Sequence, residues 1–251
     1  MKYIALHIIL IFYCVAQDTL YAITIGETSV IAEIEHKVVL NTMSLLNKGK
    51  EEPYYLVFDT VPYFYMMFQR LEDYFKKGKQ NQAFAMSSIS VTEARKVKYS
   101  FSSIYMPSKE VVFTVTDHKN VSADSWKKKG TVIGFQVKTT QEKTIQRLKK
   151  KYGVIGAPFQ AFKHRFNALL QGKINYAIAD NVELWNHEKI KILYTLDEQH
   201  SEGIAIMYMK HSTLRKKMEK YLRYYLKSPV FYKLIREKYG HDVSNYFKKY
   251  L

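Results

Sequence analysis

The sequence predicts an α/β protein of two lobes, each a mostly parallel sheet flanked by helices. Strand-like and helix-like segments alternate from residue 23 onward, and the same alternation restarts after residue 120. Such alternation is typical of parallel sheets covered by helices on both faces. The chain has 251 residues, 47% of them hydrophobic, which is enough for two cores and excludes a disordered chain.

The first 22 residues have the composition of a secretory signal. Lys2 supplies a positive charge, Tyr3–Ala16 is almost wholly apolar, and the small residue Ala22 precedes the first strand-like segment. We expect cleavage after Ala22. An uncleaved anchor is the alternative, although the apolar run is shorter than the roughly 20 residues of a bilayer span. A lipid on Cys14, the single cysteine, is disfavoured because bulky residues precede it.

The first lobe is expected to occupy residues 23–115 and 205–251. Its expected elements, in order, are a strand at 23–30, a helix capped by Thr28 or Ser29 that ends near Gly49, a strand at 54–58, a helix from Pro62 to about Gly78 and a strand at 83–90. The chain returns to this lobe for an amphipathic helix over 214–225 and a second helix after Pro229.

The second lobe is expected to occupy residues 116–204. Its expected elements are a strand at 131–136, a helix capped by Thr139 or Thr140, a short strand at 154–155, a helix that starts at Pro158 and is closed by Gly172, and a strand at 174–179. The strand-like segments 111–115 and 203–208 are placed to be the two crossings, with a ligand cleft between the lobes.

Charge and motifs exclude several classes of function. The net charge is +16, but the basic clusters are scattered along helix-like stretches, as expected of solvated faces rather than of a nucleic-acid site. Attraction to an anionic membrane surface is the alternative. The eight His are dispersed, and no metal motif, phosphate loop or nucleophile elbow occurs, so we expect no metal, no cofactor and no catalytic nucleophile.

One segment, 87–105, carries recognition chemistry. Serines leave a strand end, Thr92 can cap the following helix, and Arg95 follows one turn inside it. At the carboxyl end of a parallel strand, such a turn faces the ligand crevice, where a guanidinium can hold a carboxylate through two hydrogen bonds. An ordinary helix cap with a surface arginine is the alternative.

This segment resembles the family 3 extracellular solute-binding proteins, the periplasmic amino-acid receptors of ABC transporters. Its signature positions are occupied at matching spacing by Ser90, Thr92, Arg95, Phe101, Ser102 and Tyr105. Two further blocks match in order, Gly134–Glu142 and Ala168–Asp180, although Lys138 replaces a family glycine. The resemblance covers roughly residues 83–240 and implies a type II periplasmic-binding fold whose lobes close about a hinge.

The resemblance also implies roles for individual residues. Arg95 would hold the α-carboxylate of an amino acid, and Asp180 would accept its α-ammonium, unless Asp180 only caps a helix. Thr140, the second of the threonine pair Thr139 and Thr140, would close on the carboxylate at a helix N-terminus. The implied ligand-binding residues are Ser88, Ser90, Arg95, Thr139, Thr140 and Asp180.

The family's aromatic-proline loop after the first strand is missing. Three aromatic residues could replace it as a wall for the ligand side chain, or could simply pack in the core: Tyr63, Phe64 and Phe68.

The resemblance as a whole predicts a monomeric periplasmic receptor for an amino acid or related carboxylate, which could serve a membrane permease complex. The alternatives are an envelope sensor or orphan scaffold, and a cyclic-acid dehydratase, for which Glu27 and Glu142 are the nearest carboxylates.

Overall fold

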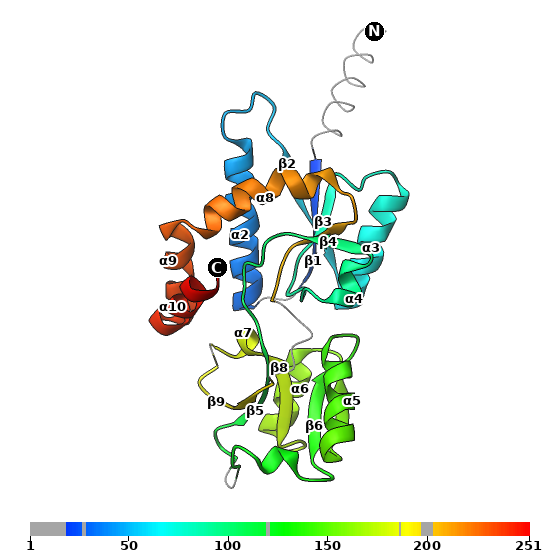
Figure 1. The fold of residues 1–251 in the computed structure, drawn as a ribbon, viewed down its shortest axis with the longest axis vertical. Coiled ribbons are helices and arrows are strands. Elements are labelled where there is room, and N and C mark those ends of the chain that lie inside the picture. Colours follow the sequence, from blue (N-terminus) through cyan, green and yellow to red (C-terminus); the bar gives the residue numbers. More distant parts are fainter. Residues whose placement is uncertain (1–18, 27–28, 119–120, 186, 197–202) are drawn as a thin grey trace, which may run out of the picture. The chain divides into compact units, whose positions relative to one another are not determined.

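The computed structural model describes residues 19–26, 29–118, 121–185, 187–196 and 203–251. The chain divides into two compact units, each with its own sheet (Figure 1). Unit 1 comprises residues 1–105 and 205–251, and unit 2 comprises residues 106–204. The part of the chain that is described contains no helix long and apolar enough to cross a membrane.

Unit 1 is built on a five-stranded sheet in the order β2-β1-β3-β10-β4. Its strands are β1 (Thr19–Ile25), β2 (Tyr55–Val61), β3 (Ala83–Ala85), β4 (Tyr99–Phe101) and β10 (Met207–Met209). β1 pairs in parallel with β2 and β3, whereas β10 runs antiparallel to β3 and β4. The sheet is therefore mixed but mostly parallel, as expected: β1, β2, β3 and β4 run in one direction, and the returning chain inserts β10 in the opposite direction.

Helices cover both faces of this sheet (Figure 1). On one side α3 (Phe64–Lys76) buries Met67 and Leu71 against Ile23. On the other side lies α2 (Val30–Asn47), whose cap is Ser29, with a hydroxyl that accepts from the Ala32 N–H at 3.1 Å. The predicted helix and one of its two proposed caps are thus confirmed, because a polar cap precedes an apolar stripe.

β1 begins four residues before the expected start of the mature chain. Leu20 and Ala22 are buried, and Tyr21 pairs with Ala83 of β3. Cleavage after Ala22 would cut this inner strand in two and remove both of these buried residues. The strand therefore contradicts a cut at that position; the rest of the proposed signal, residues 1–18, lies outside the described residues.

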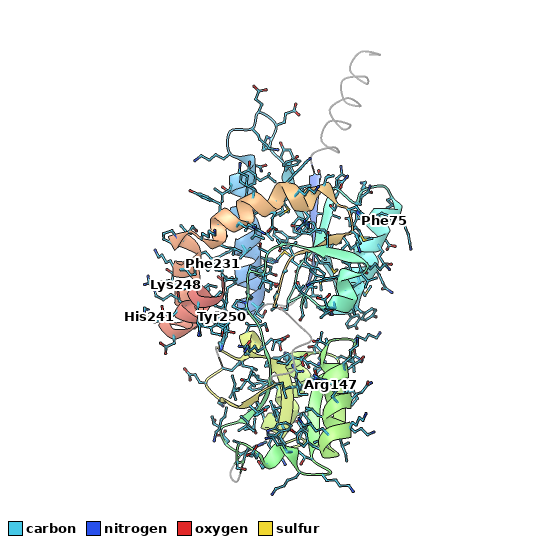
Figure 2. The ribbon with its side chains drawn as sticks, viewed as in Figure 1. Phe75, Arg147, Phe231, His241, Lys248 and Tyr250 are labelled. Atoms are coloured by element: carbon cyan, nitrogen blue, oxygen red, sulfur yellow. The ribbon has the colours of Figure 1, made fainter. Side chains whose placement is uncertain are left out.

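The C-terminal part of unit 1 is helical, with α8 (Thr213–Leu226), α9 (Pro229–Tyr239) and α10 (His241–Tyr250). Ser228 caps α9 and Pro229 occupies its first turn, where proline is favoured. Phe231, shown in Figure 2, packs between Tyr225 of α8 and Phe247 of α10, with ring centroids 5.6 and 6.1 Å away. The two predicted helices are confirmed, and α10 was not predicted.

Unit 2 has a second mixed sheet in the order β7-β6-β8-β5-β9. Its strands are β5 (Glu110–Val115), β6 (Val132–Gln136), β7 (Ile155–Phe159), β8 (Tyr176–Asp180) and β9 (Ile190–Thr195). β6 is parallel to β7 and β8, and β5 is antiparallel to β8 and β9. Its helical segments are α5 (Gln141–Tyr152), α6 (Phe162–Leu170), the short α7 (Asn181–Leu184) and the 3₁₀ turn η1 (Ser125–Lys127).

Several predicted boundaries differ from the structure. β5 pairs only with strands of unit 2, so unit 1 ends at Tyr105 and not at residue 115. Pro158 lies in the edge strand β7 and does not start a helix, since an edge strand tolerates a missing N–H. The expected strand at 83–90 stops at Ala85, because Ser87 and Ser88 both have positive φ angles, 116° and 53°. The edge strand β9 was not predicted.

Candidate functional site

The first group of predicted site residues lies in the turn between β3 and α4 (Glu93–Lys96) of unit 1. Thr92 caps α4 through its hydroxyl, which accepts from the Arg95 N–H at 3.2 Å. Arg95 Nη1 donates to the Ser90 carbonyl at 2.7 Å. The guanidinium is therefore tied to the loop that presents the serines and is held in one orientation.

Two of the three predicted wall aromatics contact this arginine. The Cζ atom of Arg95 lies 5.1 Å from the ring centroid of Phe68 and 5.6 Å from that of Phe64. Both rings are half-buried and also pack against the core, so the two interpretations of these residues are compatible. Tyr63 is 53% exposed and stacks on Tyr65, with their centroids 5.9 Å apart, and it does not share this contact.

Backbone strain marks the serine turn itself. The Ser87 hydroxyl shares a hydrogen bond of 2.7 Å with the Thr24 hydroxyl and accepts from the Ile25 N–H at 3.2 Å. The Ser88 N–H donates to Glu35 Oε1 at 2.7 Å. Left-handed φ angles are costly for residues other than glycine, so these hydrogen bonds hold a conformation that the chain would not adopt unaided.

Glu35 is a member of this group that the sequence prediction missed. It is 1% exposed, and burial raises its pKa to about 7, although hydrogen bonds from Tyr105 and from the backbone of Ser88 and Ser87 oppose the shift. A signal for it existed: Glu35 falls between Ile34 and Val38 on the buried face of α2. A charged residue at an apolar position predicts a buried polar contact.

In unit 2, the predicted threonine pair lies in the turn between β6 and α5. The Thr139 hydroxyl accepts from the Gln141 N–H at 3.2 Å and donates to the Gln136 carbonyl at 2.8 Å. Thr140 occupies the N-cap position but makes no capping hydrogen bond. Lys138 adopts a φ of 59°, the left-handed conformation that suits the glycine it replaces.

Asp180 ends β8 and precedes α7. It occupies the N-cap position of this short helix, yet its side chain makes no capping hydrogen bond. Instead Oδ1 accepts from the Ser108 hydroxyl at 3.0 Å. The carboxyl group is buried, and that burial, followed by the charges of Glu183 and Glu110, raises its pKa. The helix-cap interpretation therefore does not account for this side chain.

A buried arginine that the sequence prediction missed lies between these two turns. Arg165 of α6 is fully buried, and its Nη1 donates to Gln141 Oε1 at 2.5 Å. Its Nη2 lies 3.6 Å from Glu183 Oε2. Gln141 Oε1 also accepts from the Gln136 N–H at 2.8 Å. Like Glu35, Arg165 interrupts an apolar helix face, here between Phe162 and Leu169.

Three acidic side chains, Asp180, Glu110 and Glu183, influence one another in this part of unit 2. Glu110 is buried and accepts from the Thr144 hydroxyl, and with Glu183 it acts on the pKa of Asp180. Arg165 is the cation whose charge favours the ionised form of Asp180. The negative charges of Glu183 and Glu110 raise the pKa of Asp180, and an added positive charge close to Asp180 would favour its ionised form.

Two carboxylates were named above for the dehydratase alternative, Glu142 and Glu27. Glu142 Oε1 accepts from the Lys138 N–H at 2.7 Å and so supports the strained turn, and Glu27 lies outside the described residues. Among the residues that the structure describes, no group of three or more His, Cys, Asp or Glu could hold a metal ion.

Comparison with known proteins gives a clear result for the fold only. No protein-family model matches the chain, and no curated protein matches its sequence. Solved structures do match. The substrate-binding protein of an amino acid ABC transporter aligns with a TM-score of 0.68 at 18% identity, over 89% of this chain and 100% of its own.

Two other matches carry more specific descriptions. A Salmonella typhimurium periplasmic binding protein described as highly specific for arginine aligns with a TM-score of 0.69 at 19% identity, over 89% of this chain and 99% of its own. An ancestral amino-acid-binding protein, a precursor of cyclohexadienyl dehydratase, aligns with a TM-score of 0.67 at 17% identity, over 89% of this chain and 96% of its own. The expected resemblance is thus confirmed at the level of the two-lobed periplasmic-binding fold.

Proposed function

We propose that this protein is a periplasmic solute-binding protein that captures a small amino-acid-like ligand for an ABC transporter. Unit 1 would supply Arg95 with Ser88 and Ser90 for the α-carboxylate. Unit 2 would supply Thr139 and Thr140 for the same group and Asp180 for the α-ammonium. The proposal is of binding and not of catalysis.

The orientation of Arg95 is the observation that carries the proposal. Its guanidinium is fixed by the Ser90 carbonyl and by two aromatic rings, and so little conformational entropy would be lost when it binds a carboxylate. Asp180 supports the same conclusion from unit 2, because its buried carboxylate makes no cap and lies among other carboxylates.

The negative charges of Glu183 and Glu110 close to Asp180 favour a ligand with positive charge, and the matched Salmonella protein is described as specific for arginine. L-Arginine is therefore the first probe. Titration calorimetry of the purified protein with L-arginine, and then with the other common amino acids, should give one saturable heat with a 1:1 ratio.

Absence of heat with every amino acid would overturn the proposal and leave the sensor or orphan-scaffold alternative. Turnover of a cyclic carboxylic acid would instead indicate a dehydratase, as in the descendants of the ancestral protein matched above. A buried carboxyl group with a raised pKa, such as Asp180, could serve as a general acid there.

A further inference from the structure

Two donors from distant parts of unit 1 converge on one oxygen of Glu35. The Ser88 N–H lies 2.7 Å from Glu35 Oε1, and the Tyr105 hydroxyl lies 2.5 Å from the same atom. Glu35 and Tyr105 are both 1% exposed, so solvent does not compete for these hydrogen bonds. A buried hydrogen bond to a charged group contributes more than an exposed neutral one.

One donor lies close to the residue that holds Arg95, and the other lies at the boundary between the two units. Ser88 has a φ of 53° and lies two residues before Ser90, whose carbonyl holds Arg95. Tyr105 is the last residue of unit 1 before the chain enters unit 2. Glu35 itself lies in the second turn of α2, which packs against α8 and α9.

We propose that Glu35 is a positioning residue for the ligand site: its carboxylate holds the serine turn and Tyr105 in fixed relation to α2. This inference rests on the proposed function, since the turn matters because Ser88, Ser90 and Arg95 bind the ligand. Glu35 touches no ligand itself. It acts through the Ser88 N–H and through the Tyr105 hydroxyl.

The protonation state of Glu35 should then affect the turn. Burial raises its pKa to about 7, and among the described residues no cation contributes to the shift. The titratable and charged groups of the surrounding elements are Glu33, His36 and Lys37 on α2, Lys238 on α9, Tyr208 on β10, and Arg215 and Glu219 on α8. An ionised carboxylate accepts the Ser88 N–H more strongly than a neutral carboxyl does.

Amide hydrogen exchange at Ser88 tests this without any ligand. In the wild-type protein, the protection factor of the Ser88 amide, corrected for the intrinsic exchange rate, should fall at least threefold from pH 8 to pH 6. In Glu35→Gln it should stay flat, near the low-pH value of the wild type. In Tyr105→Phe the midpoint should move to higher pH, because the lost hydroxyl normally lowers the pKa of Glu35.

Glu219→Gln is the matched control. Glu219 also lies in unit 1 and accepts hydrogen bonds from the N–H and hydroxyl of Ser103, but its pKa is lowered, so it stays ionised over this range. This variant should change exchange at Ser103 and leave Ser88 unchanged. If Ser88 in Glu35→Gln follows the wild type at every pH, or if Tyr105→Phe leaves the midpoint where it was, the positioning role is wrong.

A ligand measurement separates this inference from the proposed function. With L-arginine as the probe, Glu35→Met should weaken binding at least tenfold, while Glu35→Gln, which keeps an acceptor oxygen, should restore most of the affinity. Failure of L-arginine and of every other amino acid to bind the wild-type protein would overturn the proposed function, whereas the Ser88 result would still decide the role of Glu35. Equal affinity of Glu35→Met and wild type would overturn the positioning role alone.

Discussion

Arg165 and Gln141 join two turns of unit 2 through a single hydrogen bond of 2.5 Å, from Nη1 to Oε1. Gln141 opens α5 directly after the threonine pair, and Arg165 also approaches Glu183, three residues beyond Asp180. The two segments that carry the predicted ligand groups of unit 2 are therefore braced by one buried guanidinium. Its burial lowers its pKa, but an arginine remains charged at any ordinary pH.

Arg165→Met should destabilise unit 2 more than a surface substitution would. The change removes a buried positive charge that lies 3.6 Å from Glu183 and a hydrogen bond to Gln141. Removal of one partner of a buried ion pair costs about 3–5 kcal/mol of unfolding free energy. Urea unfolding followed through Trp126, which is fully buried in unit 2, measures it. The control Lys150→Met, at an exposed site on α5, should change stability by less than about 0.5 kcal/mol. Equal changes in unfolding free energy for the two variants would show that Arg165 does not stabilise these two turns.

The alternation of elements was predictable because it depends on local signals. Apolar periodicity located α2 and α8, for example, and Ser29 was one of two proposed caps for α2. The directions of β5 and β10 were not predictable from such signals. β5 and β10 are buried along their whole length, as parallel strands covered on both faces are, so their composition did not reveal that they run antiparallel to their neighbours.

The buried ionic residues show a second limit of prediction from the sequence. Arg95 was predicted because a family motif surrounds it, whereas Glu35 and Arg165 occupy single positions on otherwise apolar helix faces. Periodicity gives the face but not the partner, and here the partners, Tyr105 and Gln141, lie 70 and 24 residues away in sequence. The position of the serine turn followed from the motif, but its two positive φ angles depend on contacts with β1 and α2.

The mature chain should begin before Thr19. β1 needs Leu20 and Ala22, which are buried, and Cys14 and Ala16 supply small residues at the two positions that a signal peptidase reads, so we expect cleavage after Ala16. N-terminal mass spectrometry of the secreted protein should find Gln17 first. A chain that starts at Ile23 lacks Leu20 and should lose about 2–3 kcal/mol because that buried side chain is missing from the core. A secreted protein that begins at Ile23 and is equally stable would contradict this assignment of β1.

Stability should depend on pH through Glu35. Its pKa rises from an ordinary 4.5 to about 7 on folding, so between these values the folded state binds more protons than the unfolded state. The contribution of Glu35 is therefore complete below about pH 4.5 and is lost as the pH rises through about 7, in total about 3 kcal/mol. The difference in unfolding free energy between wild type and Glu35→Gln should change by this amount from pH 5 to pH 8. A constant difference would mean that Glu35 does not titrate in this range.

Arg95→Ala should abolish amino-acid binding, by at least 100-fold, and leave the fold nearly intact. The side chain is half-buried, and its loss from the folded protein costs one hydrogen bond and a cation–π contact, about 1–2 kcal/mol. Arg215→Ala is the matched control, because Arg215 Nη1 also donates to a backbone carbonyl of unit 1, that of Phe101, at 3.1 Å. Calorimetry with L-arginine should show loss of binding only for Arg95→Ala; similar affinities of the two variants would exclude Arg95 from the site.

Asp180→Asn tests the chemical identity of the ligand. The substitution preserves the shape of the side chain and its contact with Ser108 but removes the charge. If Asp180 pairs with an α-ammonium, an amino acid should bind more weakly by about 2–4 kcal/mol, because a charge-assisted contact is lost from a buried site. The corresponding deaminated acid has no ammonium to pair and should be affected much less.

The same carboxylate should make amino-acid binding depend on pH. Burial and the neighbouring Glu183 and Glu110 raise the pKa of Asp180, so acidification protonates it sooner than an ordinary aspartate and should weaken the amino acid. In Asp180→Asn, the affinity for the amino acid should no longer fall through protonation of this residue. Asp124→Asn is the control, since Asp124 pairs with Lys127 at the surface of unit 2. This substitution should change neither the affinity for the amino acid nor that for its deaminated analogue. Equal weakening of the amino acid and its deaminated analogue would show that Asp180 only shapes the site, and the amino-acid assignment would then rest on Arg95, which any carboxylate could satisfy.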